Sequence, residues 1–501
     1  MTSERVDALP TIEADRDELA VATAAVCGGG RRFAGLFNAP REDGRTRLEA
    51  VVHGRDGYSS VVATLPVGDR SYPSLSRLVP AAAWYERELH DRYGLRPVGH
   101  PRLDPLVLPR RDDGLPPLAF GHRHEPVVPD TTALDAHASG EGMFTIPYGP
   151  VRSGVFETVE YLVETFGEDI PRLRSRLHHK HRGVDVRFED LSPEDGVLLA
   201  ERVEGTASVA HAWTYSRAIE ELTATEVPLE AEHLRVAHAE LERVVNHLES
   251  MIRHTEGSYQ AVANARLAVH KERVMRLRSA LCGNRFGRNV VIPGGVQGPP
   301  RVAPAEAAAQ IASIGGAFAA DAKALMVTPS FLDRLRGTGV LAVDLVADHG
   351  ALGPVGRASG AAEDIRSEEP YGTYRALGFA PGSCRTEGDA LARQRVRVDE
   401  VQESFRLATA ALEAVAAIDR PSWWRPVERV PDGRALAAVE APQGELLYLV
   451  EARDGRLTRV RPRCAAFHNF ALFPRAFGGD ILTDFVFIEA SFGLSIAGVA
   501  G

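Results

Sequence analysis

One ten-residue stretch, RVEGTASVAH at 202–211, concentrates side chains whose chemistry suits proton transfer. It contains a carboxyl group, Glu204, and an imidazole, His211, seven residues apart. In a helix this spacing places both side chains on one face, two turns apart. Histidine titrates near neutral pH, and burial raises the pKa of a carboxyl group toward the same range. We therefore predict a proton-relay pair; the alternative is that the two groups only neutralise each other.

Two sets of histidines suggest a metal site at first sight. The first set is crowded into four residues and the second repeats at multiples of seven along one predicted helix: His178, His179, His181; His233, His247, His254. A transition-metal site needs several well-placed ligands, and no acidic or Cys partner completes the second set. We predict a structural loop for the first set and interface or solvent-rim positions for the second, with no metal ligand in either.

The cysteines and glycines exclude two further kinds of site. The four cysteines, at 27, 282, 384 and 464, form no C-x-x-C pair and no zinc or iron–sulfur spacing. So few cysteines in a long chain fit a reducing compartment. The glycine-rich stretches at 27–30 and 293–298 lack the strand–loop–helix context of a nucleotide fingerprint, so we predict that nicotinamide does not bind here.

Size and charge limit the classes of protein. With 501 residues the chain exceeds one compact core, so we expect two or three domains. A net charge of −10 argues against a nucleic-acid partner. The N-terminus is acidic and lacks a signal-peptide core, and the longest apolar run, near 311–328, is interrupted by Asp321 and Lys323. We predict a cytoplasmic protein without a transmembrane segment of its own.

The hydrophobic pattern divides the chain into three parts and predicts the α+β class. Residues 1–110 form a small α+β domain, with strands at 33–39, 46–54 and 58–67 and a helix at 82–93 that ends at Gly94. Residues 111–148 are rich in Pro, Gly and His and predict an extended linker. Residues 149–501 predict a mainly helical domain with peripheral hairpins.

The elements of this third part have clear boundaries in the pattern. Apolar residues at steps of three and four predict a helix over 228–254. Further helices are expected near 192–221, 263–281, 303–326 and 399–418. Toward the C-terminus, Asp454-Gly455 predicts the turn of a β-hairpin.

A first resemblance lies in AAWYERELHDRYGLRPVGHPRLDPLVLP at 82–109. This stretch resembles the signature of the small hydrophilic subunit of respiratory complex I, which combines an aromatic-E-R-E helix, D-x-x-G and G-H-P. The residues that match are Trp84, Glu86, Arg87, Glu88, Asp91, Gly94, Gly99, His100 and Pro101. The resemblance implies an interface role, rather than a catalytic one, for the charged triplet and His100.

A second resemblance covers residues 149–501. Seven blocks follow in order: GPVRSGV, HRGVD, ERVEGTASVAHAWTYSRAIEEL, EHLRVAHAELERVVNHL, RFGRN with PGG, VEAPQGEL and PRCAAFHNF. They are similar to the large subunit shared by complex I and the energy-converting (group 4) nickel–iron hydrogenases. Both domains in one chain resemble the fused, formate-hydrogenlyase-type arrangement. In this family His181-Arg182 belongs to a turn motif.

The resemblance implies a metal site whose ligands are missing. Such hydrogenases hold nickel with four thiolates, two of them in R-x-C-G-x-C-x-x-x-H. The match at 202–211 has Glu204 and Ala207 in place of the cysteines, and no cysteine follows Cys464. In the E-x-P-R-G hairpin, which begins here at Glu440, the arginine is replaced by Gln443. We therefore expect no nickel–iron chemistry and no metal bound by this chain.

Quinone chemistry, as in complex I, is the next expectation. The His and Tyr that contact the quinone headgroup in the family correspond here to Arg152 and Gly205. A quinone remains possible in a cavity lined by Arg152, Glu204 and His211, with Arg202 nearby.

The resemblance also implies partners. These are a small subunit that carries a 4Fe–4S cluster near Glu204 and His211, and antiporter-like membrane subunits; no cofactor is expected on this chain itself. The chain would be the peripheral, cytoplasmic core subunit of a complex I-like oxidoreductase that couples electron transfer to ion or proton movement. The alternative is a non-redox subunit with a structural or conformational-coupling role.

Overall fold

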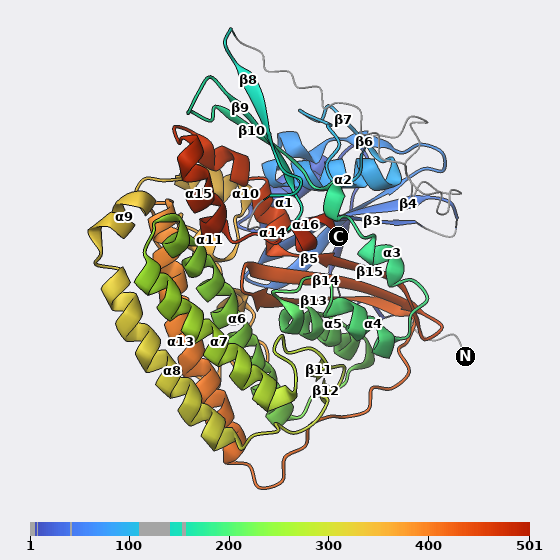
Figure 1. Ribbon diagram of the computed structural model, residues 1–501. Helices are drawn as coiled ribbons and strands as arrows, with labels where there is room; N and C mark the ends of the chain where they lie inside the picture. Colours follow the sequence, from blue (N-terminus) through green and yellow to red (C-terminus); the bar gives the residue numbers. More distant parts are fainter. Residues whose placement is uncertain (1–5, 8, 41–42, 110–140, 153–156) are drawn as a thin grey trace.

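The computed structural model describes residues 6–7, 9–40, 43–109, 141–152 and 157–501. An N-terminal sheet domain, a central sheet and a bundle of long helices lie against one another (Figure 1). This arrangement confirms the predicted α+β class, in which a small α+β domain precedes a mainly helical one.

The N-terminal domain is a four-stranded sheet in the order β2-β5-β4-β3. Its strands are β2 (Thr11–Glu13), β3 (Arg32–Pro40), β4 (Thr46–Gly54) and β5 (Gly57–Leu65), and the helices α1 (Leu19–Gly28) and α2 (Ala83–Tyr93) pack on it. The three predicted strands and the predicted helix are confirmed. Gly94 ends α2 with a positive φ of 70°, a conformation that glycine adopts without strain.

The central sheet has the order β1-β13-β14-β15. β1 (Val6–Asp7) runs parallel to β13 (Gly433–Ala441), and β14 (Gly444–Arg453) and β15 (Arg456–Arg463) form the predicted hairpin around Asp454-Gly455. The prediction put hairpins at the periphery of the helical domain. β13 and β14 are instead almost wholly buried, because the helix α5 (Ser208–Thr223) packs on them and side chains of the N-terminal domain reach them.

The bundle consists of four long helices: α6 (Leu229–Gly257), α7 (Ala261–Cys282), α8 (Pro304–Leu325) and α13 (Ala390–Ala416). The first three confirm their predictions. α13 begins at Ala390 rather than near 399, because the carboxylate of Asp389 accepts a hydrogen bond from Ala392 N and caps the helix there.

The prediction of one helix over 192–221 is wrong. The structure has α4 (Pro193–Ala200), a turn over 201–207, and then α5. α5 starts anew because a carboxylate from another helix, that of Glu242 in α6, accepts hydrogen bonds from Val209 N (2.8 Å) and Ala210 N (3.0 Å). Glu242 thus caps the first turn of α5, where the preceding residue, Ala207, supplies no side-chain acceptor.

Most of the predicted linker, 111–140, lies outside the described residues. Its last residues form β8 (Phe144–Tyr148), which pairs with β9 (Glu160–Thr165); β10 (Arg172–Arg176) completes this sheet. The strand therefore belongs to the sheet of the following domain.

Short elements complete the described parts of the chain. They are β6 (Ser71–Pro73), β7 (Arg96–Val98), β11 (Val291–Ile292), β12 (Gly295–Val296), α3 (Val184–Arg187), α9 (Pro329–Leu335), α10 (Val343–His349), α11 (Gly353–Arg357), α12 (Ile365–Glu368), α14 (Ala465–Phe470), α15 (Phe485–Phe492) and α16 (Ile496–Ala500). Within the described ranges no single helix has both the length and the apolar character needed to cross a membrane; α8 and α9, bent by 80°, meet those limits only as a pair.

Candidate functional site

The predicted pair of Glu204 and His211 is brought together, but not by a shared helix. Glu204 lies in the turn before α5, and His211 lies in its first turn. His211 Nε2 is 3.5 Å from Glu204 Oε2 and makes no hydrogen bond, while His211 Nδ1 is hydrogen-bonded to the Tyr448 hydroxyl at 2.7 Å. Both residues are at most 1% exposed, so their contact is screened from water.

Gln443 holds the other side of Glu204. Its side-chain amide donates to Glu204 Oε1 at 2.7 Å, and the Thr206 hydroxyl donates to the same oxygen at 2.9 Å. Gln443 thus binds Glu204; the resemblance implies that these two positions hold an arginine and a cysteine in the hydrogenases of the family.

Cys464 adjoins this pair and was not among the predicted site residues. Burial, and then the nearby charge of Glu204, raise the pKa of its thiol to about 12. A Cβ atom placed on Gly498 in α16 would lie 2.8 Å from Glu204 Oε2 and 2.9 Å from Cys464 Sγ. The PRCAAFHNF block contains the cysteine, but only the fold places it beside residues from two distant segments.

A cavity of about 280 Å³ lies next to these groups, on the far side of Gln443 and Thr206. Arg152 lines it, as predicted, and its guanidinium donates two hydrogen bonds of 2.9 Å to Glu489, which also accepts one from the Tyr161 hydroxyl at 3.2 Å. Burial disfavours the charge of Arg152, but its hydrogen bonds to Glu489 outweigh that effect and raise its pKa. Glu204 and His211 do not line the cavity, so the predicted lining is wrong for these two residues.

Glu157, on the wall of the same cavity, was also missed by sequence reasoning. Its carboxylate accepts a hydrogen bond from Ala497 N at 2.8 Å. Burial raises the pKa of Glu157, and the charge of Glu204 acts in the same direction. No motif marks this residue, because its role depends on the position of α16.

Arg202, a further predicted cavity residue, points away from the site. Its guanidinium donates to Leu198 O at 2.6 Å and pairs with Glu201, and almost half of its side chain is exposed. Arg202 and Glu204 both lie in the turn after α4, where the side chain of Arg202 faces solvent and that of Glu204 is buried.

His181 and Arg182 support the site from the outside. The His181 ring is hydrogen-bonded to Ala500 O, and Arg182 donates to Val203 O (2.6 Å) and Ala497 O (2.9 Å). These hydrogen bonds connect α16 with the turn that contains Glu204. The predicted structural turn is consistent with these contacts, and no group of three or more metal-ligating side chains occurs among the described residues.

Of the two positions predicted for the α6 histidines, interface or solvent rim, the solvent rim is wrong. His233, His247 and His254 are all buried, and His247 has an acidic partner, Glu400, at 2.7 Å. Burial lowers the pKa of His247 to about 4. The long-range partner on α13 could not be recognised from the spacing along one helix.

The charged triplet of α2 divides between two roles. Glu86 is buried within its own domain and accepts hydrogen bonds from the Ser74 hydroxyl and Leu75 N, and Arg87 donates to the carbonyl oxygens of Asp104 and Pro105. His100 is likewise internal, hydrogen-bonded to the Ala83 carbonyl. Only Glu88 lies between the two domains.

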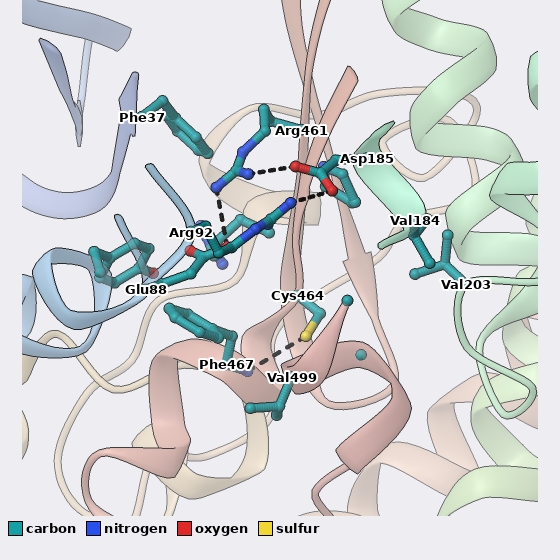
Figure 2. A pocket seen from close by; sticks show the side chains of 15 residues that line it. Phe37, Glu88, Arg92, Val184, Asp185, Val203, Arg461, Cys464, Phe467 and Val499 are labelled. Carbon is teal, nitrogen blue, oxygen red and sulfur yellow. Dashed lines mark hydrogen bonds and ion pairs between the residues drawn. The ribbon is translucent and has the colours of Figure 1, made fainter. Parts of the chain in front are cut away.

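Figure 2 shows the surroundings of Glu88, where Arg92 and Arg461 flank Asp185 beside a cavity of about 40 Å³. Arg461 bridges Glu88 (3.1 Å) and Asp185 (2.7 Å), and Arg92 contacts both acids from the other side. Although burial opposes it, the charge of Arg92 together with that of Arg461 holds the pKa of Asp185 well below its usual range. The cavity is water-sized and belongs to a domain interface.

Comparisons with known proteins match two parts of the chain to known families. Residues 13–119 match the family of the 30 kDa subunit of respiratory-chain NADH dehydrogenase, and residues 261–424 and 422–500 match the family of its 49 kDa subunit. The carbon monoxide-induced hydrogenase of Rhodospirillum rubrum is 30% identical over 70% of this chain and 96% of its own length.

Two further relatives align with a larger share of the chain. Formate hydrogenlyase subunit 5 of Escherichia coli is 28% identical over 82% of this chain and 74% of its own length. The C/D subunit of the NADH-quinone oxidoreductase of Acidiphilium cryptum is 25% identical over 99% of this chain and 94% of its own length. The chain therefore belongs to the family that the 49 kDa subunit of respiratory NADH dehydrogenase shares with these hydrogenase subunits, with a 30 kDa-type domain fused ahead of it.

Proposed function

We propose that this chain is the core subunit of a membrane-associated, complex I-like oxidoreductase that works without nickel–iron chemistry. In this proposal the chain lies at the cytoplasmic face of the membrane. It takes part in electron transfer from a 4Fe–4S cluster on a partner small subunit, and antiporter-like membrane subunits couple that transfer to ion or proton movement. The support for these assignments is the family and the site geometry.

The donor set near Glu204 supports the absence of nickel. Redox nickel in this family requires thiolates, and soft metal ions select sulfur ligands. Around Glu204 the described side chains include one thiol, Cys464, one imidazole, the amide of Gln443 and the hydroxyl of Thr206. Burial disfavours the thiolate form of Cys464. These residues do not fit a nickel–iron centre.

The cavity beside Arg152 suits the headgroup of a small polar-ended ligand such as a quinone. Its walls combine apolar side chains, including Phe473, Leu494 and Ile496, with a few convergent polar groups. To bind Arg152, Tyr161 or Thr206, a quinone carbonyl oxygen would have to replace Glu489 or Glu204 as the acceptor, because these donors serve those carboxylates when no ligand is bound. A bound quinone would supply a two-electron acceptor, and Glu204 and His211 lie behind the wall where they can hold protons.

One observation favours the non-redox alternative. Arg152 donates two hydrogen bonds to Glu489, and Glu204 accepts from Gln443 and Thr206, so these charged groups have polar partners without a ligand. In that case the site transmits conformational or protonation changes within the complex.

The test uses the purified native complex. Its metal content is measured, and the rate at which an added quinone re-oxidises the reduced cluster is compared for the wild type, Glu204→Gln, His211→Ala and Arg202→Gln. We expect no stoichiometric nickel, a quinone rate lowered at least tenfold by the first two substitutions, and no change with Arg202→Gln, whose side chain points away. Stoichiometric nickel contradicts the donor argument. No quinone turnover in the wild type favours the structural alternative.

A further inference from the structure

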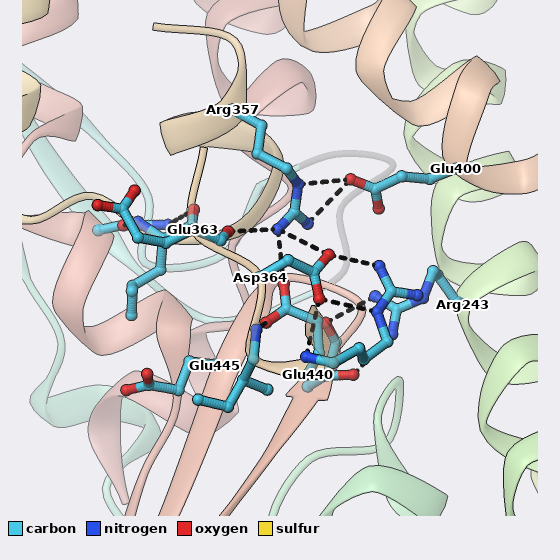
Figure 3. A network of polar contacts seen from close by, with 12 residues as sticks. Arg243, Arg357, Glu363, Asp364, Glu400, Glu440 and Glu445 are labelled. Atoms are coloured by element: carbon cyan, nitrogen blue, oxygen red, sulfur yellow. Dashed lines mark hydrogen bonds and ion pairs between the residues drawn. The ribbon is translucent and has the colours of Figure 1, made fainter. Parts of the chain in front are cut away.

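Seven charged side chains form a buried group away from the cavity, here termed the internal cluster. They lie between α6, α11, α12, α13 and β13, and they are Glu240, Arg243, Arg357, Asp364, Arg366, Glu400 and Glu440. Figure 3 labels all of them except Glu240 and Arg366. None is more than 8% exposed. Charges so deeply buried must be neutralised locally, because an unpaired charge in the interior is costly.

Arg357 is the centre of the internal cluster. It donates to Glu440 Oε1 and to Glu400 Oε1, each at 2.9 Å, and lies 3.3 Å from Asp364 Oδ2. One guanidinium therefore faces three carboxyl groups.

The two remaining arginines serve the other carboxyl groups. Arg366 donates two hydrogen bonds to Asp364, at 2.9 and 2.7 Å, and one to Glu240 at 3.2 Å. Arg243 contacts Glu240 at 3.1 Å and uses its other nitrogens on the carbonyl oxygens of Glu440 and Ala441. Its charge acts on the carboxyl group of Glu440, but it makes no hydrogen bond to that group.

The internal cluster thus has four carboxyl groups and three guanidinium groups. Neither of two nearby bases adds a charged hydrogen bond to these carboxyl groups. His247, bonded to Glu400, has a pKa lowered by burial to about 4 and is neutral near pH 7. Arg397, one turn before Glu400, donates to the carbonyl oxygens of Arg393 and Phe492; its charge acts on Glu400, but it makes no hydrogen bond to a carboxyl group of the internal cluster. Among the groups that are joined by hydrogen bonds, one added proton balances the charges.

The contacts indicate which group holds that proton. Glu240 accepts from both its arginines and from the hydroxyls of Tyr374 and Ser404, and Glu400 accepts from Arg357 and His247. Glu440 has a guanidinium on one oxygen only, and its other oxygen lies 3.4 Å from Ile365 N. Burial, followed by the charge of Asp364, raises the pKa of Glu440 to about 7.

Solvent reaches the edge of the internal cluster. A cavity of about 160 Å³, large enough for several water molecules, has Arg357, Asp364 and Glu400 in its wall, and the partly exposed Asp399 and Glu403 also line it. Protons can therefore exchange between bulk water and the carboxyl groups that share Arg357 with Glu440.

We propose that Glu440 is an internal proton-binding site that exchanges with solvent through this cavity. It takes up one proton from water without any redox change. The β13–β14 turn connects it to the candidate functional site, because Gln443, three residues after Glu440, holds Glu204. This last step rests on the proposed function; the proton-binding site itself does not.

The groups that face Glu440 come from every neighbouring element. They are Glu240 and Arg243 of α6, Arg357 of α11, Asp364 and Arg366 at α12, Glu400 of α13, Glu445 of β14, which lies opposite Glu440 in the sheet, and Tyr371, whose hydroxyl accepts from Glu440 N at 2.8 Å. Among these acids, Asp364 shares the Arg357 guanidinium most directly with Glu440. Removing the charge of Asp364 should therefore change the proton affinity of Glu440 more than any other single substitution in the internal cluster.

The first experiment measures the infrared carbonyl band of protonated carboxyl groups in the full chain at pH 5 and pH 9. Glu440→Gln is compared with Glu363→Gln, a substitution at an exposed position of the adjoining segment. Glu242 is also buried, with a pKa raised by burial to about 7, so it contributes a band of its own. We expect Glu440→Gln to remove one component and Glu363→Gln to remove none. An unchanged spectrum in Glu440→Gln overturns the proposal.

A second variant keeps the test decisive where Glu440→Gln fails to fold. Asp364→Asn leaves three carboxyl groups for three arginines, so Glu440 no longer needs the proton. The midpoint of its band should fall by at least one pH unit, about tenfold in proton affinity. An unchanged midpoint overturns the proposal. The infrared experiment contains no quinone and no electron donor, so it tests the proton-binding site independently of the proposed function. If the quinone assay shows no turnover while the infrared band of Glu440 is present, only the proposed function is contradicted.

Discussion

The candidate site is built from single residues that approach one another more closely than their sequence positions suggest. Glu204 in the turn, Gln443 in a hairpin and Cys464 before α14 meet beside Gly498 of α16. The absence of a side chain at Gly498 leaves room for the Glu204 carboxylate. Gly498 therefore has a packing role that a helix propensity would not reveal.

Replacement of Gly498 by alanine should disturb this contact. The new methyl group would lie under 3.0 Å from both Glu204 Oε2 and Cys464 Sγ, and overpacking of a tight core typically costs about 1–3 kcal/mol. We expect the free energy of unfolding in urea to fall by that amount. Gly478→Ala is the matched control, since nothing lies within 4 Å of its Cβ position. Equal stabilities of the two variants would contradict the close approach.

At the scale of elements, helix ends decide where the functional groups lie. α5 starts at Ser208 because Glu242 of α6 caps it, whereas α13 starts at Ala390 because its own neighbour, Asp389, does. Asp389 also accepts a hydrogen bond from Gly337 N at 2.8 Å, so it ties the preceding loop to the bundle. α13 carries Glu400, and its start fixes the register of the internal cluster.

Asp389→Ala should weaken the bundle. It removes the cap of α13 and leaves Gly337 N without its acceptor, which together should cost about 1–3 kcal/mol. Asp389→Asn retains one acceptor oxygen and should lose less. The midpoint of urea unfolding, followed by circular dichroism, checks both variants. A loss as large in Asp389→Asn as in Asp389→Ala would show that capping is not the cause.

At the scale of the whole molecule, the two domains are joined by buried ion pairs. Glu49 of β4 meets Arg434 of β13 at 2.7 Å, and Asp185 meets Arg461 at 2.7 Å and Arg92 of α2. All five residues are buried or nearly so. The N-terminal domain and the helical domain should therefore unfold as one cooperative unit.

Asp185→Asn should destabilise both domains together. It leaves Arg92 and Arg461 without their shared carboxylate, and breaking a buried ion pair on one side costs about 3–5 kcal/mol. The folded-state pKa of Asp185 lies below its ordinary value of 3.8, so the carboxylate stabilises the fold above that pH and loses its effect as the pH falls. The difference in unfolding free energy between wild type and variant should therefore shrink below pH 4.

Calorimetry at pH 7 and pH 3 checks this prediction, with the exposed Asp17→Asn as control. Two separate transitions in the wild type would contradict cooperative unfolding. A difference that persists unchanged at pH 3 would contradict the assigned role of the Asp185 charge.

The sequence by itself determined the elements whose signals are local. Apolar periodicity predicted α6, α7 and α8, Asp454-Gly455 predicted the hairpin turn, and the ordered blocks led to the family. The approach of Glu204 to His211 was also foreseen, although for the wrong reason, since a turn rather than a shared helix produces it.

Only the tertiary structure decided which groups surround that pair. Arg202 points away from the pair, Cys464 and Glu157 lie close to it, and His247 is hydrogen-bonded to Glu400. The sequence did not predict these positions, because they depend on how segments far apart in the chain pack together. The charge balance of the internal cluster is of the same kind. It arises from residues on five elements, and burial makes an unbalanced charge there costly in free energy. The local pattern of charges along the sequence does not show which residues are buried together.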